Sequence, residues 1–224
     1  LQVFKDGDKY TGYCFACNTY EPDPYKNKPA NYKPVSFKKS QEQIDAEIQE
    51  ISTYRTVDLP ERKLRADSLA YFGVKIGLSE SDGVTPVTHY YPYYKEGNHV
   101  AYKVRLIEGK RMWAIGSTKD VDLFGWNQAL AAGGKKLFIT EGELDAVSLY
   151  QIFKDKNKGT QYADFNPAVV SLSNGAGSAP RDLAKVLKEI RKTFKEIVLV
   201  FDMDEPGKTA MDAVVKIIPD ALCA

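Results

Sequence analysis

Two short acidic motifs, each directly after an apolar run, constrain the fold of this chain more than any other feature. The first is Glu141-Gly-Glu-Leu-Asp145, which follows Lys136-Leu-Phe-Ile-Thr140. The second is Asp202-Met-Asp204, which follows Glu196-Ile-Val-Leu-Val-Phe201. Short apolar runs of this kind are typical of strands buried on both faces. The chain is therefore predicted to place several carboxylates at the carboxyl ends of parallel strands, where open α/β sheets build their sites.

The pattern around these motifs alternates between strand and helix from Gly133 onward. We expect strands near 136–140, 168–172 and 196–202, and helices near 143–154, 180–193 and 207–217. Such an alternation predicts a parallel sheet with crossover helices.

The preceding region, residues 40–132, predicts a smaller mixed α+β subdomain. A helix is expected from Ser40, with Gln43 completing a capping box, and a second helix from about Pro60 to Gly73. Strands are expected near 85–94, 100–107 and 111–115. His89 and His99 lie in this β-rich part without the spacing of metal ligands, so we interpret both as structural or surface residues.

Residues 1–20 have the pattern of a small β-module. Two strand-like runs, 1–4 and 10–13, flank a turn and lead to Cys14-Phe-Ala-Cys17. Residues 21–39 contain four prolines and many lysines, which is the composition of a linker.

Composition is that of a globular protein, with 43% hydrophobic residues among 224. No apolar run approaches the roughly 20 residues of a membrane helix, so no membrane partner is expected. Three cysteines and no signal peptide predict a reduced, cytoplasmic setting. The net charge of +1 predicts no partner, but local lysine and arginine patches at 24–39 and 103–111 are either phosphate contacts or ordinary solvated surface.

The acids themselves admit two interpretations. Thr140 and Glu143 have the spacing of a capping box, so Glu143 either starts a helix or joins the site. Asp202 and Asp204 follow a fully apolar strand and repel each other unless a cation lies between them; the alternative is a solvated turn. Carboxylates gathered in this way suit a hard cation such as magnesium.

A glycine-rich loop, Ser173-Asn-Gly-Ala-Gly-Ser178, follows the middle strand. Its backbone N–H groups at Ser173, Gly175 and Gly177 either bind a phosphate or form a plain strand-to-helix loop. After the second acidic motif, Pro206 suits the first turn of a helix and Gly207 permits a close backbone approach.

Taken together, E-G-E-L-D-A, S-L-S-N-G-A-G-S-A and V-F-D-M-D-E-P-G-K-T-A resemble the TOPRIM domain of DNA primases, which topoisomerases and some nucleases share. The pattern is most similar to primase–helicases of short-tailed phages, and Leu123-Phe-Gly125-Trp126 and Lys103-Val-Arg105 also resemble that family. The resemblance implies an α/β TOPRIM (Rossmann-like) parallel sheet at 133–224, an N-terminal polymerase subdomain at 40–132, a linker at 21–39 and a partial zinc ribbon at 1–20.

The resemblance also implies an activity: template-directed synthesis of short RNA primers on single-stranded DNA from ribonucleoside triphosphates, with Mg²⁺ or Mn²⁺. Asp202 and Asp204 would be metal ligands, and Glu141 a ligand or a general base. The secondary acidic candidates are Glu143 and Asp145, and the candidates for holding triphosphate or template are Lys103, Arg105 and Lys110. A helicase domain or other replisome proteins would be partners, in the cytoplasm of the host cell.

The chain departs from the family's pattern at both ends. A zinc ribbon needs four ligands, but Cys14 and Cys17 form a single C-x-x-C pair, and Cys223 is too far away to replace the other. We expect the missing pair before Leu1 in the intact parent protein. A further acidic strand end is expected beyond Ala224, which would make the TOPRIM domain truncated here.

Three other functions fit parts of the pattern. Phosphatases of the haloacid-dehalogenase type also place D-x-D after an apolar strand, but there the motif opens the domain. A TOPRIM nuclease or topoisomerase shares the acids, and a non-catalytic DNA-binding arm of a helicase keeps the fold without needing them. Substitution of Asp202 distinguishes a DNA-binding arm from a polymerase. A DNA-binding arm should keep its function after the substitution, whereas a polymerase should lose its activity.

Overall fold

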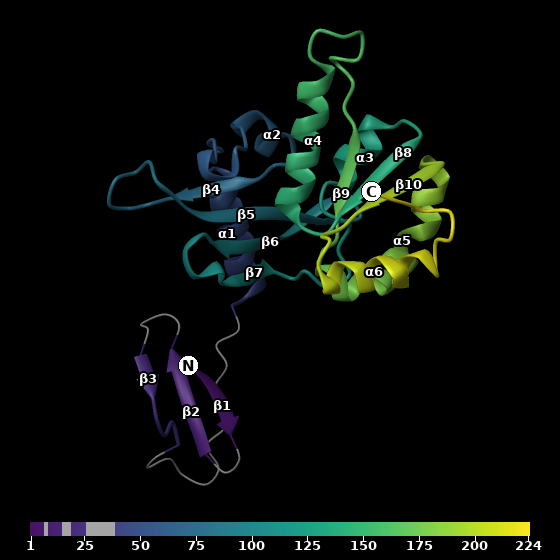
Figure 1. The fold of residues 1–224 in the computed structure, drawn as a ribbon. Helices are drawn as coiled ribbons and strands as arrows, with labels where there is room; N and C mark the ends of the chain where they lie inside the picture. Colours follow the sequence, from purple (N-terminus) through teal and green to yellow (C-terminus); the bar gives the residue numbers. More distant parts are fainter. Residues whose placement is uncertain (7–8, 15–18, 26–38) are drawn as a thin grey trace. The chain divides into compact units, whose positions relative to one another are not determined.

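The computed structural model describes residues 1–6, 9–14, 19–25 and 39–224 (Figure 1). The chain divides into two compact units, Leu1–Lys39 and Ser40–Ala224.

The first unit contains a three-stranded antiparallel sheet in the order β1-β2-β3. Its strands are β1 (Gln2–Asp6), β2 (Lys9–Cys14) and β3 (Thr19–Glu21). The hairpin predicted from the first 13 residues is confirmed by the pairing of β1 with β2, whereas β3 was not predicted. Cys14 ends β2, while Cys17 and most of the predicted linker lie outside the described residues.

The second unit is built around a parallel sheet with strand order β11-β10-β8-β9, which confirms the α/β prediction. Its strands are β8 (Lys136–Thr140), β9 (Ala168–Ser171), β10 (Glu196–Val200) and β11 (Leu222–Cys223). The crossover helices are α4 (Glu143–Asn157), α5 (Ala179–Thr193) and α6 (Glu205–Val215), with a short 3-10 turn, η3 (Ala176–Ser178), before α5.

Both faces of the parallel sheet are covered, as the continuous apolar strands require. On β8, Leu137 and Ile139 belong to the core that contains α5 and α6 residues, while Phe138 packs on the opposite core with α4. Figure 1 shows α4 running beside both sheets of this unit, with α5 and α6 on the other side of the parallel sheet.

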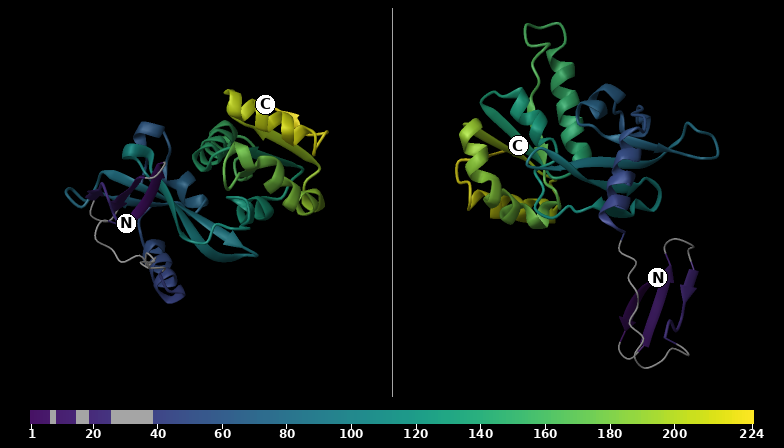
Figure 2. Two further views of the ribbon diagram at one scale, coloured as in Figure 1. Left: turned by 90° about the horizontal axis from the view of Figure 1, so that it is seen from below. Right: turned by 180° about the vertical axis from the view of Figure 1, so that it is seen from behind.

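A second sheet precedes the parallel one, an antiparallel meander in the order β4-β5-β6-β7. Its strands are β4 (Lys75–Leu78), β5 (Pro86–Lys95), β6 (Asn98–Leu106) and β7 (Met112–Gly116), and the turn η2 (Glu108–Lys110) joins the last two. The helix α1 (Gln41–Ser52) packs on one face, seen in front of the sheet in the right-hand view of Figure 2. The other face presents Tyr91 and Tyr93 to the core that α4 shares.

The second predicted helix is wrong as one continuous element. The structure has a 3-10 turn, η1 (Pro60–Arg62), and a separate short helix, α2 (Ala66–Tyr71). Lys63 between them adopts a left-handed conformation with φ of 55°, and Leu59 and Leu64 form a backbone bridge around it. The bridge satisfies backbone groups that a continuous helix would have used.

A further helix that the sequence did not predict, α3 (Trp126–Ala132), follows a short contact with the edge of the parallel sheet. Phe124 and Ser171 exchange backbone hydrogen bonds of 3.1 and 3.0 Å. Gly125 then turns the chain with φ of +80°, and a Cβ there would lie 2.7 Å from the Phe72 ring. Only glycine therefore fits between this bridge and α3.

None of the helices in the described part of the chain is both long enough and apolar enough to cross a membrane.

Candidate active site

Three strand ends meet at one edge of the parallel sheet. Thr140 at the end of β8 pairs in register with Val200 on β10 and with Ser171 on β9. Glu141 and Asp202 come one and two residues after these paired positions, so both lie at this edge, as the sequence predicted. The edge thus gathers the two acidic motifs and the glycine-rich loop.

Glu141 is the acid whose surroundings leave its charge least compensated. Its Oε2 atom is buried and has no hydrogen-bond partner in the described structure. Burial raises the pKa of Glu141 above its ordinary value, the charge of Asp202 raises it further, and backbone hydrogen bonds from Ala176 and Asp202 oppose this. A cation at this position would relieve both the burial and the repulsion.

Asp202 and Asp204 are exposed at the end of β10. Asp204 is the N-cap of α6, where its Oδ1 accepts a hydrogen bond of 2.9 Å from the backbone N–H of Gly207. This cap starts α6 at Glu205, two residues earlier than predicted. A Cβ on Gly207 would overlap the carbonyl oxygen of Asp202, so glycine allows the close approach that the sequence predicted.

The helix α4 begins at Glu143, as predicted, but its capping residue differs from the expected one. Gly142, not Thr140, is the N-cap, and Asp145 accepts a hydrogen bond of 3.1 Å from the Gly142 N–H. The hydroxyl of Thr140 instead donates to the carbonyl oxygens of Gly142 and Val170, at 3.1 and 3.2 Å. The predicted Thr140–Glu143 capping box is therefore wrong, because Thr140 still belongs to β8.

Asp145 lies close enough to the acidic edge to interact with it. Burial raises the pKa of its carboxyl, the charge of Asp202 raises it further, and the Gly142 N–H opposes both. Arg62 on η1 also lowers it, which places a cation near this acid that the sequence did not single out. No periodicity or motif around Arg62 could have revealed it.

Glu143 has a different environment from its neighbours. Only 6% of it is exposed, and its Oε1 accepts a hydrogen bond of 2.7 Å from the Tyr93 hydroxyl. The same oxygen forms an ion pair of 2.7 Å with Lys103 Nζ. Glu143 is thus a paired, buried carboxylate in the first turn of α4, and Tyr93 is a contact that the sequence gave no reason to expect.

The glycine-rich loop is tied to its neighbours through Ser173. The Ser173 hydroxyl donates to the carbonyl oxygen of Asp122 at 3.3 Å, and its own carbonyl accepts from Lys103 Nζ at 3.1 Å. Gly175 adopts φ of +71°, a left-handed conformation suited to glycine, whereas Gly177 is exposed without a positive φ.

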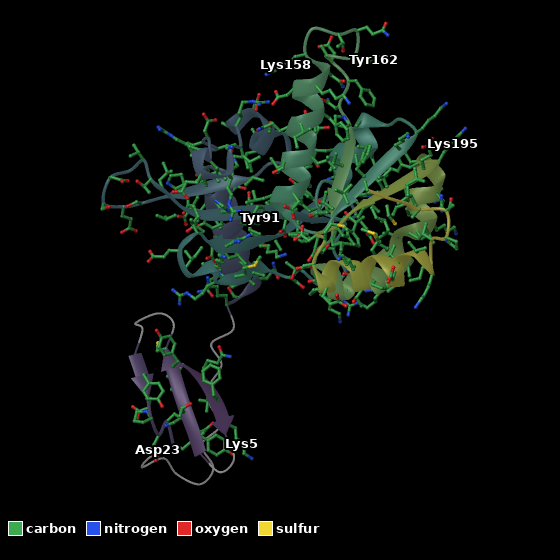
Figure 3. All side chains as sticks on the ribbon, viewed as in Figure 1. Lys5, Asp23, Tyr91, Lys158, Tyr162 and Lys195 are labelled. Atoms are coloured by element: carbon green, nitrogen blue, oxygen red, sulfur yellow. The ribbon has the colours of Figure 1, made fainter. Side chains whose placement is uncertain are left out.

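The remaining basic candidates are separated. Arg105 is half-buried on β6, beside buried His89, whereas Lys110 lies in the exposed turn η2. Figure 3 places Tyr91 on the antiparallel sheet close to α4, while Lys158 and Tyr162 mark the far end of that helix. Of the basic candidates, Lys103 is the one that contacts an acid at the N-terminal end of α4.

The acidic edge fits a hard divalent cation in its donor chemistry. Its donors are carboxylate oxygens, and the buried Oε2 of Glu141 has no other partner in the described residues. Within the residues that the structure describes, however, no three Asp, Glu, His or Cys side chains are grouped closely enough to form a metal site. Mg²⁺ commonly takes one or two carboxylates and completes its shell with water and phosphate oxygens, which suits such a partial set.

Comparison with known proteins agrees with the fold. Residues 138–224 match the family described as Toprim-like. Over 125 residues, 56% of this chain, the sequence is 34% identical to a DNA helicase/primase of Enterobacteria phage T3. The match covers only 20% of the length of that relative.

Two solved structures are similar over most of the chain. The crystal structure of the primase fragment of the bacteriophage T7 primase-helicase has a TM-score of 0.63 and 27% identity, covering 95% of this chain and 79% of that one. A second structure contains bacteriophage T7 lagging-strand DNA polymerase interacting with primase domains of two subunits bound to an RNA/DNA hybrid and dTTP. It has a TM-score of 0.61 and 31% identity, covering 76% of this chain and 79% of that one.

The parallel sheet with acids at its carboxyl edge is thus a Toprim domain. The chain belongs to the TOPRIM-type DNA primases, alongside the primase parts of short-tailed phage primase–helicases. The resemblance seen in the acidic motifs is confirmed.

Proposed function

We propose that this chain is the RNA-polymerase part of a phage primase–helicase, which synthesises short RNA primers on single-stranded DNA from ribonucleoside triphosphates. The observation that carries this proposal is the buried, unpartnered Oε2 of Glu141, held beside the charge of Asp202. The RNA/DNA hybrid in the solved complex with T7 primase domains supports a nucleic-acid substrate. A helicase domain and other replisome proteins in the host cytoplasm are the proposed partners.

Asp202, Asp204 and Glu141 are the proposed ligands of Mg²⁺ or Mn²⁺, and Asp145 lies near enough for the charge of Asp202 to raise its pKa. When bound, such an ion supplies a lowered pKa for the attacking hydroxyl and neutralises the charge of the triphosphate. The protein's own contribution is positional, because the register of β8 with β10 sets the two acidic motifs side by side. Gly207 contributes because its lack of a side chain allows α6 to begin in contact with the backbone carbonyl of Asp202.

The basic side of the proposed site comes from the antiparallel sheet. Lys103 and Arg105 share one face of β6 and are proposed to hold triphosphate or template phosphates, with Lys110 further away on η2. The backbone of the Ser173–Ser178 loop adds a second candidate phosphate contact. Cys14 and Cys17 remain the proposed half of a zinc site in the intact parent.

The test is primer synthesis by the intact parent protein. Single-stranded DNA of mixed sequence, Mg²⁺ and labelled ribonucleotides would be supplied to the wild type, to Asp202→Ala and to Asp212→Ala. Asp212 is an exposed acid on the same helix as the Asp204 cap and serves as the matched control. We expect short labelled oligoribonucleotides that fall by about a thousandfold or more in Asp202→Ala and persist in Asp212→Ala.

Two outcomes would contradict the proposal. DNA binding without synthesis, unchanged by Asp202→Ala, would indicate a non-catalytic DNA-binding arm. Metal-dependent nicking of DNA, lost in Asp202→Ala, would indicate the nuclease or topoisomerase branch of TOPRIM proteins.

A further inference from the structure

A buried polar network joins the antiparallel sheet to the start of α4. The Tyr93 hydroxyl, from β5, donates to Glu143 Oε1 at 2.7 Å. Lys103 Nζ, from β6, lies 2.7 Å from the same oxygen and donates to the Ser173 carbonyl at 3.1 Å. Two strands and one helix of the second unit therefore meet at a single carboxylate oxygen, and Lys103 links them to the Ser173–Ser178 loop.

Because this network is buried, losing any one of its hydrogen bonds would leave a polar group without a partner. Tyr93 is 1% exposed and Glu143 6%, and the Lys103 side chain is 20% exposed. A buried carboxylate is tolerated only when it is both paired and hydrogen-bonded. Lys103 supplies the opposite charge and Tyr93 supplies a neutral donor, since burial and the nearby Glu143 raise the pKa of the phenol well above its ordinary value.

The network also determines where the Lys103 ammonium lies. It stands between Glu143 and the Ser173 carbonyl, at the first residue of the glycine-rich loop. Ala176 of that loop provides a backbone hydrogen bond to Glu141. A change in the orientation of Glu143 would thus move a cation that lies next to the acidic edge.

We propose that Tyr93 is a positioning residue, whose hydroxyl holds Glu143 in the orientation that places Lys103 at the Ser173–Ser178 loop. In this proposal Tyr93 contacts Glu143 and affects the substrate only through Lys103. The inference rests on the proposed function, because it takes Lys103 as a contact for the ribonucleoside triphosphate.

The chain offers a matched control on the same strand. Tyr91 lies two residues earlier on the same face of β5 and is equally buried, at 1% exposed. Its hydroxyl is 3.0 Å from His89 Nδ1 rather than at an acid. Replacing either tyrosine with phenylalanine removes one buried hydroxyl and keeps the ring packing.

The experiment compares Tyr93→Phe and Tyr91→Phe in the intact parent protein by two readouts. The first is the steady-state KM and kcat for ribonucleoside triphosphates. The second, independent of activity, is the rate at which an amine-reactive ester labels Lys103, followed by peptide mass spectrometry. For Tyr93→Phe we expect KM to rise about tenfold with kcat within about twofold, and Lys103 labelling to rise about threefold. Tyr91→Phe should change neither.

Several results would overturn the inference. If Lys103 is labelled at the wild-type rate in Tyr93→Phe, the hydroxyl does not position it, whatever the enzyme's activity. If both variants lose activity and melting temperature equally, Tyr93 has only a packing role. If the wild type makes no primer, the proposed function is contradicted. In that case, faster labelling of Lys103 in Tyr93→Phe alone would still support the positioning role of Tyr93.

Discussion

Glu141 and Glu143 are two residues apart in one motif, yet they lie in opposite electrostatic environments. Glu141 has a buried oxygen without a hydrogen-bond partner in the described residues, next to the charge of Asp202. Glu143 is buried as well, but one of its oxygens receives both a hydroxyl and an ammonium. A carboxylate that the chain satisfies by itself supports the structure, whereas one left uncompensated is available to a ligand.

The same contrast separates the two sheets of this unit. The carboxyl edge of the parallel sheet collects like charges that repel, while the antiparallel sheet buries Tyr91 and Tyr93 with their hydroxyls hydrogen-bonded. Stability and function are thus expected to respond differently to charge changes in the two regions, which the following measurements test.

The largest effect is expected from breaking the satisfied pair. Lys103→Met leaves the buried Glu143 carboxylate without its cation and should lower the free energy of unfolding by about 3–5 kcal/mol, measured by urea denaturation. Lys136→Met breaks an exposed ion pair with Glu196 and should change it by about 0–1 kcal/mol. Similar losses in both variants would show that Glu143 is more hydrated than its burial indicates.

A pH effect of intermediate size is expected from His89. Burial, with Arg105 and Arg62 nearby, lowers its pKa to about 4 from 6.5. The unfolded state therefore binds a proton at higher pH than the folded state, so this contribution to stability is lost as pH falls from about 6.5 to 4. The loss should approach about 3 kcal/mol.

Urea denaturation of the wild type and of His89→Gln across that pH range would measure this loss of stability. The difference between the two proteins is needed because carboxyl groups also titrate in this range. His99→Gln is the comparison variant, since His99 is only half-buried, and its pKa is lowered by burial but raised by a hydrogen bond to Ala101. A wild-type pH dependence that His89→Gln does not flatten would contradict the assignment.

The smallest effect, and the opposite sign, is expected at the acidic edge. Asp202→Asn removes a charge that raises the pKa of Glu141, so at neutral pH without divalent metal it should raise stability by up to about 1 kcal/mol. When the pKa of a carboxyl is raised in the folded state, its contribution to stability is lost as pH rises from the ordinary pKa to the raised one. Asp202→Asn should lower the pKa of Glu141 in the folded state, so this loss should occur over a smaller pH range.

Thermal melting with and without MgCl₂ completes this test. We expect Mg²⁺ to raise the melting temperature of the wild type and to raise that of Asp202→Asn less, because a ligand that binds the folded state stabilises it. A variant less stable than the wild type in metal-free buffer would show that Asp202 is satisfied by the chain itself.

The local sequence determined the parallel sheet and the acids at its edge. Short apolar runs at 136–140 and 196–200 indicated buried strands, and the residues that follow such strands in a parallel sheet meet at one edge. Glycine and proline after Asp204 likewise indicated a helix start and a close approach without knowledge of the fold.

The tertiary structure alone decided how each acid is used. Glu143 is satisfied by Tyr93, 50 residues away in the sequence, and by a lysine on another strand, and no local pattern encodes such contacts. The break at Lys63 depends in the same way on a backbone bridge around it. Periodicity and turn chemistry act over a few residues, whereas the burial and pairing of a charge depend on which distant elements pack around it.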